Sequence, residues 1–222
     1  MILENLYYSS YYKNHRLKYE VLFSDNNFES EKKAILNDDY YIIHKKYSAY
    51  IHQKDIIGYD RSIYKINDNK LIYNYKSDDA RMFKIINHNN REYFIFNRDL
   101  SGFSILKLDN TYEEFSFYNN KFIAPNGTIV FTDAQYSNNK ILFYIFYLLK
   151  SDNGTFKRIF DYLLFDLSDI SSENNIHFAE IRKLVSNVYN HKLYFIYKAY
   201  FKDNDIIAED LLSKEKFILK NI

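Results

Sequence analysis

Residues 92–108, which read EYFIFNRDLSGFSILKL, indicate the fold class most clearly. Glu92–Asn97 is apolar on both faces, as expected of a strand that is covered on two sides. Residues 98–102 bring together Asp, Ser and Gly, which favour turns, and Phe103–Leu108 is a second run of strand-forming residues. The stretch therefore predicts an antiparallel hairpin.

The same alternation of apolar runs and turn signals extends along the chain. With four Gly and one Pro, the sequence must use Asn and Asp for most turns, since these residues tolerate left-handed backbone conformations. Clusters such as Asn87–Asn90 and Asn138-Asn139 fit that role, and Tyr112–Tyr118 has the alternation of an edge strand. Further strands are predicted at Ile129–Asp133, Ile141–Leu149, Phe160–Leu167, Leu193–Phe201, Ile206–Leu212 and Lys216–Leu219.

Helical signals are weak. Glu29–Leu36 and Ser172–Leu184 have charge spacings that a short helix could use, but neither has an apolar stripe sustained over three turns. The sequence therefore favours a fold without substantial helix in either segment.

A weak internal repeat is visible. Four segments, about 33–77, 80–119, 120–163 and 178–222, share an order of strands and turns and are each roughly 40 to 45 residues long, the length of a four-stranded propeller blade. We expect a single all-β domain over residues 1–222, an antiparallel meander arranged as a small β-propeller-like ring. A two-sheet sandwich or a wide barrel are the alternatives.

Composition narrows the function classes. Lys plus Arg (30) balances Asp plus Glu (29), so nucleic acid and anionic membrane are not expected partners. Cysteine is absent, which excludes disulfides, thiolate metal sites and cysteine nucleophiles.

The N-terminal residues have no signal-peptide pattern, and the longest uncharged apolar stretch, Ile141–Leu149, is far shorter than the roughly 20 residues of a membrane helix. We expect a cytoplasmic protein. The abundance of Tyr (24) and Phe (19) is typical of an AT-rich genome.

Part of the chain resembles a group of uncharacterised bacterial all-β proteins. The matching residues are Tyr93–Phe96, Arg98–Ile105, Phe131–Asp133 with Tyr136, and Asp161–Ser168, within Arg91–Ile170. In that group the segment corresponding to Phe143–Phe160 carries a Gly-Cys-Tyr-Trp element and a proline, and this chain lacks that element. The resemblance implies an all-β, propeller-like fold and implies no function.

The motifs of common active sites are missing. No two of the six histidines have the i, i+2 or i, i+4 spacing of a metal pair, no Gly-rich phosphate loop is present, and Gly-x-Ser-x-Gly does not occur. We therefore predict no metal, no cofactor and no catalytic residue from sequence.

Four aspartates lie at or near predicted strand ends: Asp99, Asp133, Asp161 and Asp166. If they folded close together, a pair could provide acid–base or glycosidic chemistry. The alternative is that each caps a turn through bonds to the local backbone.

These observations favour a non-enzymatic protein-binding module, for example an immunity-type or inhibitory binder, whose partner is another protein. The candidate binding residues are Arg98, Asp99, Asp133 and Tyr136. The alternative is a hydrolase that acts on carbohydrate through paired carboxylates. A concave pocket holding two carboxylates would favour the hydrolase, whereas a patch of Tyr, Phe and Arg would favour the binder. The oligomeric state is left open.

The first testable prediction concerns Arg98 and Asp99, in the turn between the two best-defined strands. If they belong to an interface, Arg98→Ala should leave the fold intact and weaken partner binding by at least about 1–2 kcal/mol. If they only shape the turn, Arg98→Ala should change neither stability nor binding. Melting temperature and partner affinity, measured together for Arg98→Ala and Asp99→Ala, check this. Unchanged affinity in both would remove the pair from the site.

Overall fold

The computed structural model describes residues 21–77, 83–97, 102–109, 111, 114–118, 127–150, 153–171, 178–193 and 196–220. The chain divides into two compact units, Met1–Ala80 and Arg81–Ile222. The single all-β domain expected over residues 1–222 stays a prediction. Arg98 and Asp99 lie outside the described residues.

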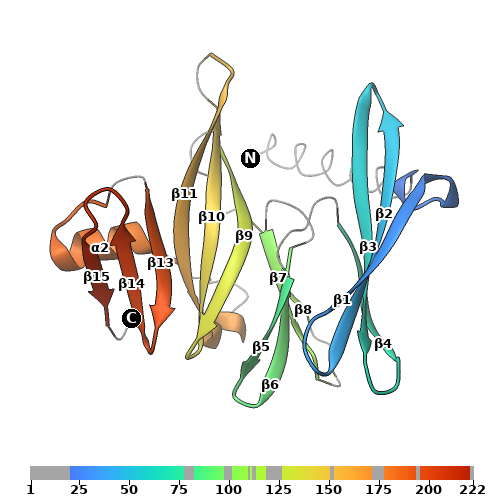
Figure 1. Ribbon diagram of the computed structural model, residues 1–222, viewed down its shortest axis with the longest axis horizontal. Helices are drawn as coiled ribbons and strands as arrows, with labels where there is room; N and C mark the ends of the chain where they lie inside the picture. Colours follow the sequence, from blue (N-terminus) through green and yellow to red (C-terminus); the bar gives the residue numbers. More distant parts are fainter. Residues whose placement is uncertain are drawn as a thin grey trace, which may run out of the picture. The chain divides into compact units, whose positions relative to one another are not determined.

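The first unit contains one antiparallel sheet whose strands follow sequence order (Figure 1). Its elements are the 3₁₀ helix η1 (Asp25–Asn27) and the strands β1 (Phe28–Ile35), β2 (Tyr40–Ile51), β3 (Lys54–Lys65) and β4 (Leu71–Ser77). Glu29–Leu36, a segment with weak helical signals, is thus almost entirely strand. Gly58 of β3 lets Leu22 pack closely, because a Cβ at this position would lie 2.7 Å from Leu22 Cδ1.

The second unit contains three antiparallel sheets, each again in sequence order. The first comprises β5 (Phe83–His88), β6 (Arg91–Phe96), β7 (Gly102–Lys107) and β8 (Glu114–Tyr118). The second comprises β9 (Gly127–Ser137), β10 (Lys140–Lys150), β11 (Phe156–Asp166) and β12 (Phe178–Glu180). The third comprises β13 (Tyr197–Lys202), β14 (Asp205–Asp210) and β15 (Lys216–Leu219). The 3₁₀ helix η3 (Leu167–Ser171) follows β11, and the α-helix α2 (Ile181–Tyr189) follows β12.

The predicted all-β class is confirmed. The chain forms four separate sheets, and none of them closes into a barrel within the described residues. The predicted hairpin around residues 92–108 is the β6–β7 pair, in which Ile95 lies opposite Ile105. Phe94, Ile95 and Phe96 are fully buried, as expected of a strand covered on both faces.

The four repeated segments correspond roughly to the four sheets, but their boundaries differ, and the first sheet begins at Phe28 rather than near residue 33. The third repeat does not end at residue 163, because β11 continues to Asp166 and β12 adds a strand at Phe178–Glu180. Helix α2 overlaps Ser172–Leu184, where no substantial helix was expected. Its apolar residues Ile181, Leu184 and Val185 have helical spacing, but nine residues are too short for a three-turn stripe. Packing against the sheets stabilises this helix.

Asn and Asp form many of the turns, as predicted. The β5–β6 turn places Asn89 and Asn90 at φ of 51° and 59°, and the β9–β10 turn places Asn138 and Asn139 at 43° and 64°. Two successive residues with positive φ give a hairpin turn whose twist matches the flanking strands.

A cluster of phenylalanines forms the core between the β5–β8 and β9–β12 sheets. Phe103 of β7 is 2% exposed, and its ring centroid lies 4.5 Å from that of Phe143 and 5.1 Å from that of Phe131. The rings of Phe165 and Phe178 follow at 6.0 and 5.8 Å. Contacts of this kind add to the hydrophobic effect of burying five large side chains.

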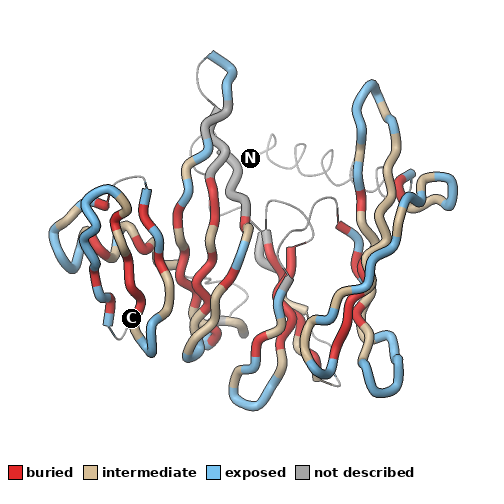
Figure 2. Tube along the Cα trace, viewed as in Figure 1, coloured by how far each residue is buried: buried red, intermediate tan, exposed pale blue. Residues whose placement is uncertain are grey.

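The opposite face of the β9–β12 sheet forms a second core. There Leu142 and Leu164 pack with Ile181 and Val185 of α2 and with apolar residues of the β13–β15 sheet. The β9–β12 sheet is therefore covered on both faces over part of its length, and Figure 2 shows buried residues along the middle of its strands. No helix among the described residues is long and apolar enough to span a membrane.

Substitution of Phe103 tests the importance of the first core. Phe103→Ala should lower the free energy of unfolding by about 3–5 kcal/mol, because it leaves a cavity among four other rings. Phe160→Ala, at a side chain that is 44% exposed, is the matched control and should cost less than about 1 kcal/mol. Urea unfolding followed by circular dichroism measures both, and equal losses would contradict the assignment.

Candidate functional site

The structure describes two of the four predicted binding residues, Asp133 and Tyr136, both on β9. Tyr136 packs against the phenylalanine core. Asp133 lies opposite Tyr144, where the β9–β10 register shifts by one residue. Burial raises the pKa of Tyr162, and the charge of Asp133 adds to this effect. Asp133 and Tyr136 are three residues apart on a stretch of β9 with continuous register, so they lie on opposite faces of the sheet and do not form one site.

Tyr136 lines a surface hollow of about 610 Å³. The other lining residues are Lys84, Ile85, Ile86, Asn87, Gln135 and Phe201. The Tyr136 hydroxyl lies 3.1 Å from His88 Nδ1, and Lys84 Nζ donates to the carbonyl oxygen of Ala134 at 2.7 Å. None of the described residues that line this hollow carries a carboxylate.

The face that carries Asp133 also carries a group of aromatic residues and an arginine. We define the aromatic face as Tyr144 and Phe146 of β10 with Arg158 and Phe160 of β11. The rings of Tyr144 and Phe160 stack with centroids 5.6 Å apart and planes inclined by 12°. The Arg158 guanidinium lies 5.5 Å from the centroid of Phe146, within cation–π range. Phe160 is 44% exposed and Arg158 is exposed.

The register of β10 and β11 assembles this face. Phe146 lies opposite Phe160, and Tyr144 and Arg158 are each two residues away along their own strand. Side chains two residues apart share a face, so all four emerge together. Sequence reasoning missed the group because Ile141–Leu149 is apolar throughout and hides its alternation.

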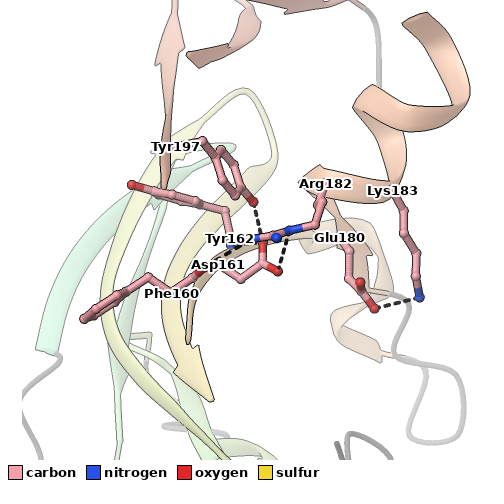
Figure 3. Close-up of polar contacts among 7 residues, drawn as sticks. All are labelled: Phe160, Asp161, Tyr162, Glu180, Arg182, Lys183 and Tyr197. Carbon is pink, nitrogen blue, oxygen red and sulfur yellow. Dashed lines mark hydrogen bonds and ion pairs between the residues drawn. The ribbon is translucent and has the colours of Figure 1, made fainter. Parts of the chain in front are cut away.

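A buried polar cluster forms around Asp161 of β11 (Figure 3). The Tyr197 hydroxyl donates a hydrogen bond to the Asp161 carboxylate, and Arg182 Nε lies 3.4 Å from Asp161 Oδ2. The backbone N–H of Tyr162 donates to Asp161 Oδ1 at 2.8 Å. Burial raises the pKa of Asp161, although Tyr197 and Arg182 both act to lower it. Burial also raises the pKa of Tyr197, so this hydroxyl stays protonated as a donor.

Arg182 and Asp161 together cap the outer edge of β11. Strand β12 pairs with β11 only at Leu163–Phe165. Just beyond it, Arg182 Nη2 donates to the carbonyl oxygen of Phe160 at 3.4 Å, while Asp161 accepts the N–H of Tyr162. The two side chains take hydrogen-bonding positions that another strand would occupy.

Tyr189, at the other end of α2, caps a second sheet edge. Its hydroxyl donates to the carbonyl oxygen of Ile218 at 2.6 Å and accepts the N–H of Ile218 at 3.1 Å. Ile218 belongs to β15, the edge strand of its sheet. Helix α2 thus protects two edges, and the Asp161 cluster has a structural explanation that needs no catalysis.

Asp133 and Asp166, the other two strand-end aspartates that the structure describes, form local bonds, as the capping interpretation predicts. Asp133 Oδ1 accepts the N–H of Ala134 at 2.7 Å, and Asp166 Oδ1 accepts the N–H and hydroxyl of Ser168 at 2.9 and 2.8 Å. These contacts do not bring two carboxylates together.

The described histidines do not gather into a metal site. No group of three or more His, Asp or Glu residues could hold a metal within the described part of the chain. His44 Nδ1 accepts a hydrogen bond from Arg61 Nε at 2.9 Å. Burial, together with the charge of Arg61, lowers the pKa of His44 to about 4, so this histidine is neutral near pH 7.

Comparison with known proteins gives little guidance. No protein-family model matches the chain, and no curated protein matches it in sequence. One similar solved structure is MPT-4, a mannose phosphorylase from Leishmania mexicana, in complex with a phosphate ion. It has a TM-score of 0.34 and 11% identity, and the match covers 87% of this chain and 68% of that one. This likeness carries no argument about fold or function.

The raised pKa of Asp161 gives a testable pH dependence. Its ordinary pKa is 3.8, so just above this value the folded protein retains a proton that the unfolded chain releases. The contribution of Asp161 to stability therefore falls as the pH rises through its folded pKa, and is restored as the pH falls. Asp161→Asn removes this titration. We compare the free energy of unfolding of the wild type with that of Asp161→Asn. The difference, wild type minus variant, should become more positive as the pH is lowered from about 7 to about 4.5. Urea unfolding measures it, and a difference that shifts the other way would contradict the prediction.

Proposed function

We propose that this protein is a non-enzymatic protein-binding module that contacts its partner through the aromatic face. The observation that carries the proposal is the exposure of Phe160 beside Arg158 on a packed sheet. Aromatic residues and arginine are enriched in the parts of interfaces that contribute most binding energy.

The arrangement suits binding for a second reason, which is rigidity. Phe160 stacks on Tyr144, and Arg158 lies over Phe146, so both exposed side chains are supported by neighbours. A supported side chain loses less conformational entropy when a partner binds. An immunity-type or inhibitory binder is one concrete form of such a module.

The alternative, a hydrolase acting on carbohydrate, receives no support from the described aspartates. It requires two carboxylates facing one substrate. Asp161 is bonded to Tyr197 and Arg182, and Asp166 to Ser168. Arg98 and Asp99 lie outside the described residues, and they stay a separate prediction of binding residues.

We extend the proposal to architecture and location. In the second unit, three sequential meanders pack in order through two cores, which is how neighbouring blades pack in a propeller. This supports a propeller-like arrangement and agrees with the fold implied by the bacterial resemblance. The proposed location is the cytoplasm.

Site-specific photo-crosslinking in the native host tests the proposed surface. A benzophenone amino acid in place of Phe160 should give a discrete adduct with one partner protein, identified by mass spectrometry. The matched control places the same group at Tyr50 of β2, which is 72% exposed in the first unit, and should not capture that partner. Adding Arg158→Ala should reduce the adduct at least about tenfold, the effect of a modest hot spot.

Two results would contradict the proposal. One is the absence of a specific adduct at residue 160. The other is turnover of a glycoside panel by the wild-type protein, which would support the hydrolase alternative instead.

A further inference from the structure

We propose that the partner binds as an extended strand, pairing antiparallel with the outer edge of β11 at residues 156–160. This inference rests on the proposed function, since it specifies how a protein partner engages the aromatic face. It commits to a segment in which an apolar residue is followed two positions later by Asp or Glu.

Within the described residues, the outer edge of β11 has no neighbouring strand over residues 156–162. Residues 156–166 of β11 all pair with β10, but β12 pairs only with Leu163–Phe165. In the strand order β12-β11-β10-β9, β12 is the strand beside this edge, and it ends at Glu180, where α2 begins. Peptides add to sheet edges of this kind through main-chain hydrogen bonds.

Backbone groups of Arg158 and Phe160 face outward from this edge. The Phe160 carbonyl accepts a hydrogen bond from Arg182 of α2, whereas the N–H of Leu167, seven residues later, bonds to Asn139 on the β10 side. In an antiparallel strand the N–H and C=O of one residue point to the same side, and alternate residues share that side. The N–H of Phe160 and both the N–H and C=O of Arg158 therefore point to the outer edge.

Arg182 and Asp161 limit how far along β11 an added strand can pair. The carbonyl of Phe160 and the N–H of Tyr162 already bond to Arg182 and Asp161. A partner strand therefore meets these two side chains beyond Phe160. The cap leaves residues 156–160 as the section where pairing is possible.

Phe160 and Arg158 determine which side chains the partner segment should carry. A residue opposite Phe160 would pack beside an aromatic ring that is 44% exposed, so an apolar side chain fits there. In antiparallel pairing, the residue two positions later lies opposite Arg158, an exposed cation, and a carboxylate is complementary to it. Directly opposed side chains of a sheet lie close enough for both contacts.

The test uses a synthetic peptide, acetyl-Thr-Phe-Thr-Glu-Val-Thr-amide, titrated into the isotopically labelled full chain. Binding should shift the backbone amide resonances of Arg158 and Phe160 in magnetic resonance spectra. Arg158→Glu should weaken this binding and should favour a peptide with Lys in place of Glu. This exchange of preference would not follow from a merely structural effect of the substitution.

Two N-methylated peptides distinguish strand pairing from docking of side chains. Methylation of the glutamate nitrogen removes the N–H that would donate to the Arg158 carbonyl, and should weaken binding at least about tenfold. The control peptide is methylated at the backbone nitrogen of the Thr between Phe and Glu. That N–H points away from β11, so its loss should change the affinity by less than about twofold.

Several outcomes would overturn the inference. One is that the two methylated peptides bind with equal affinity. Another is that millimolar peptide does not shift the backbone amide resonances of Arg158 and Phe160. Protection of these amides from hydrogen exchange without peptide would show that the edge is already covered. Protection that rises with protein concentration would assign the edge to a second copy of the chain. If photo-crosslinking at residue 160 still captures a partner in any of these cases, the proposed function survives and strand pairing does not.

Discussion

The β9–β12 sheet must bury apolar side chains on both of its faces, and much of the second unit follows from this constraint. On one face the rings of Phe131, Phe143 and Phe165 gather around Phe103. On the other face Leu142 and Leu164 are covered by α2 and the β13–β15 sheet. A sheet covered on one side alone would leave one of these sets in water, at a cost of about 25 cal/mol for each Å² of apolar surface. The neighbouring sheets are therefore needed to complete the central one.

Helix α2 solves a separate problem, which is the exposure of sheet edges. Unpaired N–H and C=O groups at an edge invite pairing with other chains. Arg182 in the first turn and Tyr189 at the end of the helix bond to the outer edges of β11 and β15. The apolar residues Ile181 and Val185 of the same helix are buried in the second core and so fix the position of the helix. Nine residues thus protect two edges, and the Asp161–Arg182–Tyr197 cluster is part of that protection.

The aromatic face is exposed where this coverage ends. Tyr162 is half-buried and packs against the second core, whereas Phe160, two residues earlier on the same strand, is 44% exposed. The transition from core to surface along one strand places aromatic side chains on a rigid support while leaving them accessible. Rigid aromatic side chains and arginine are suited to a binding surface, and this is the physical basis of the proposed function.

The sequence by itself determined the all-β class, the β6–β7 hairpin and the use of Asn and Asp at turns, because alternation and turn propensity are local properties. Residues 89–90 and 138–139 have the backbone angles that their residue types favour. The local bonds of Asp133 and Asp166 were also predictable, since a strand-end aspartate reaches its own backbone. Tertiary structure decided what depends on residues distant in sequence. Asp133 and Tyr136 were predicted to share one site, but β9 pairs with β10 in continuous register between them, so these residues, three apart on one strand, lie on opposite faces. Helix α2 is stabilised because Ile181 and Val185 are buried against apolar residues of other elements. The aromatic face exists because the pairing of β10 with β11 aligns Phe146 with Phe160, and no local pattern in either strand encodes that register.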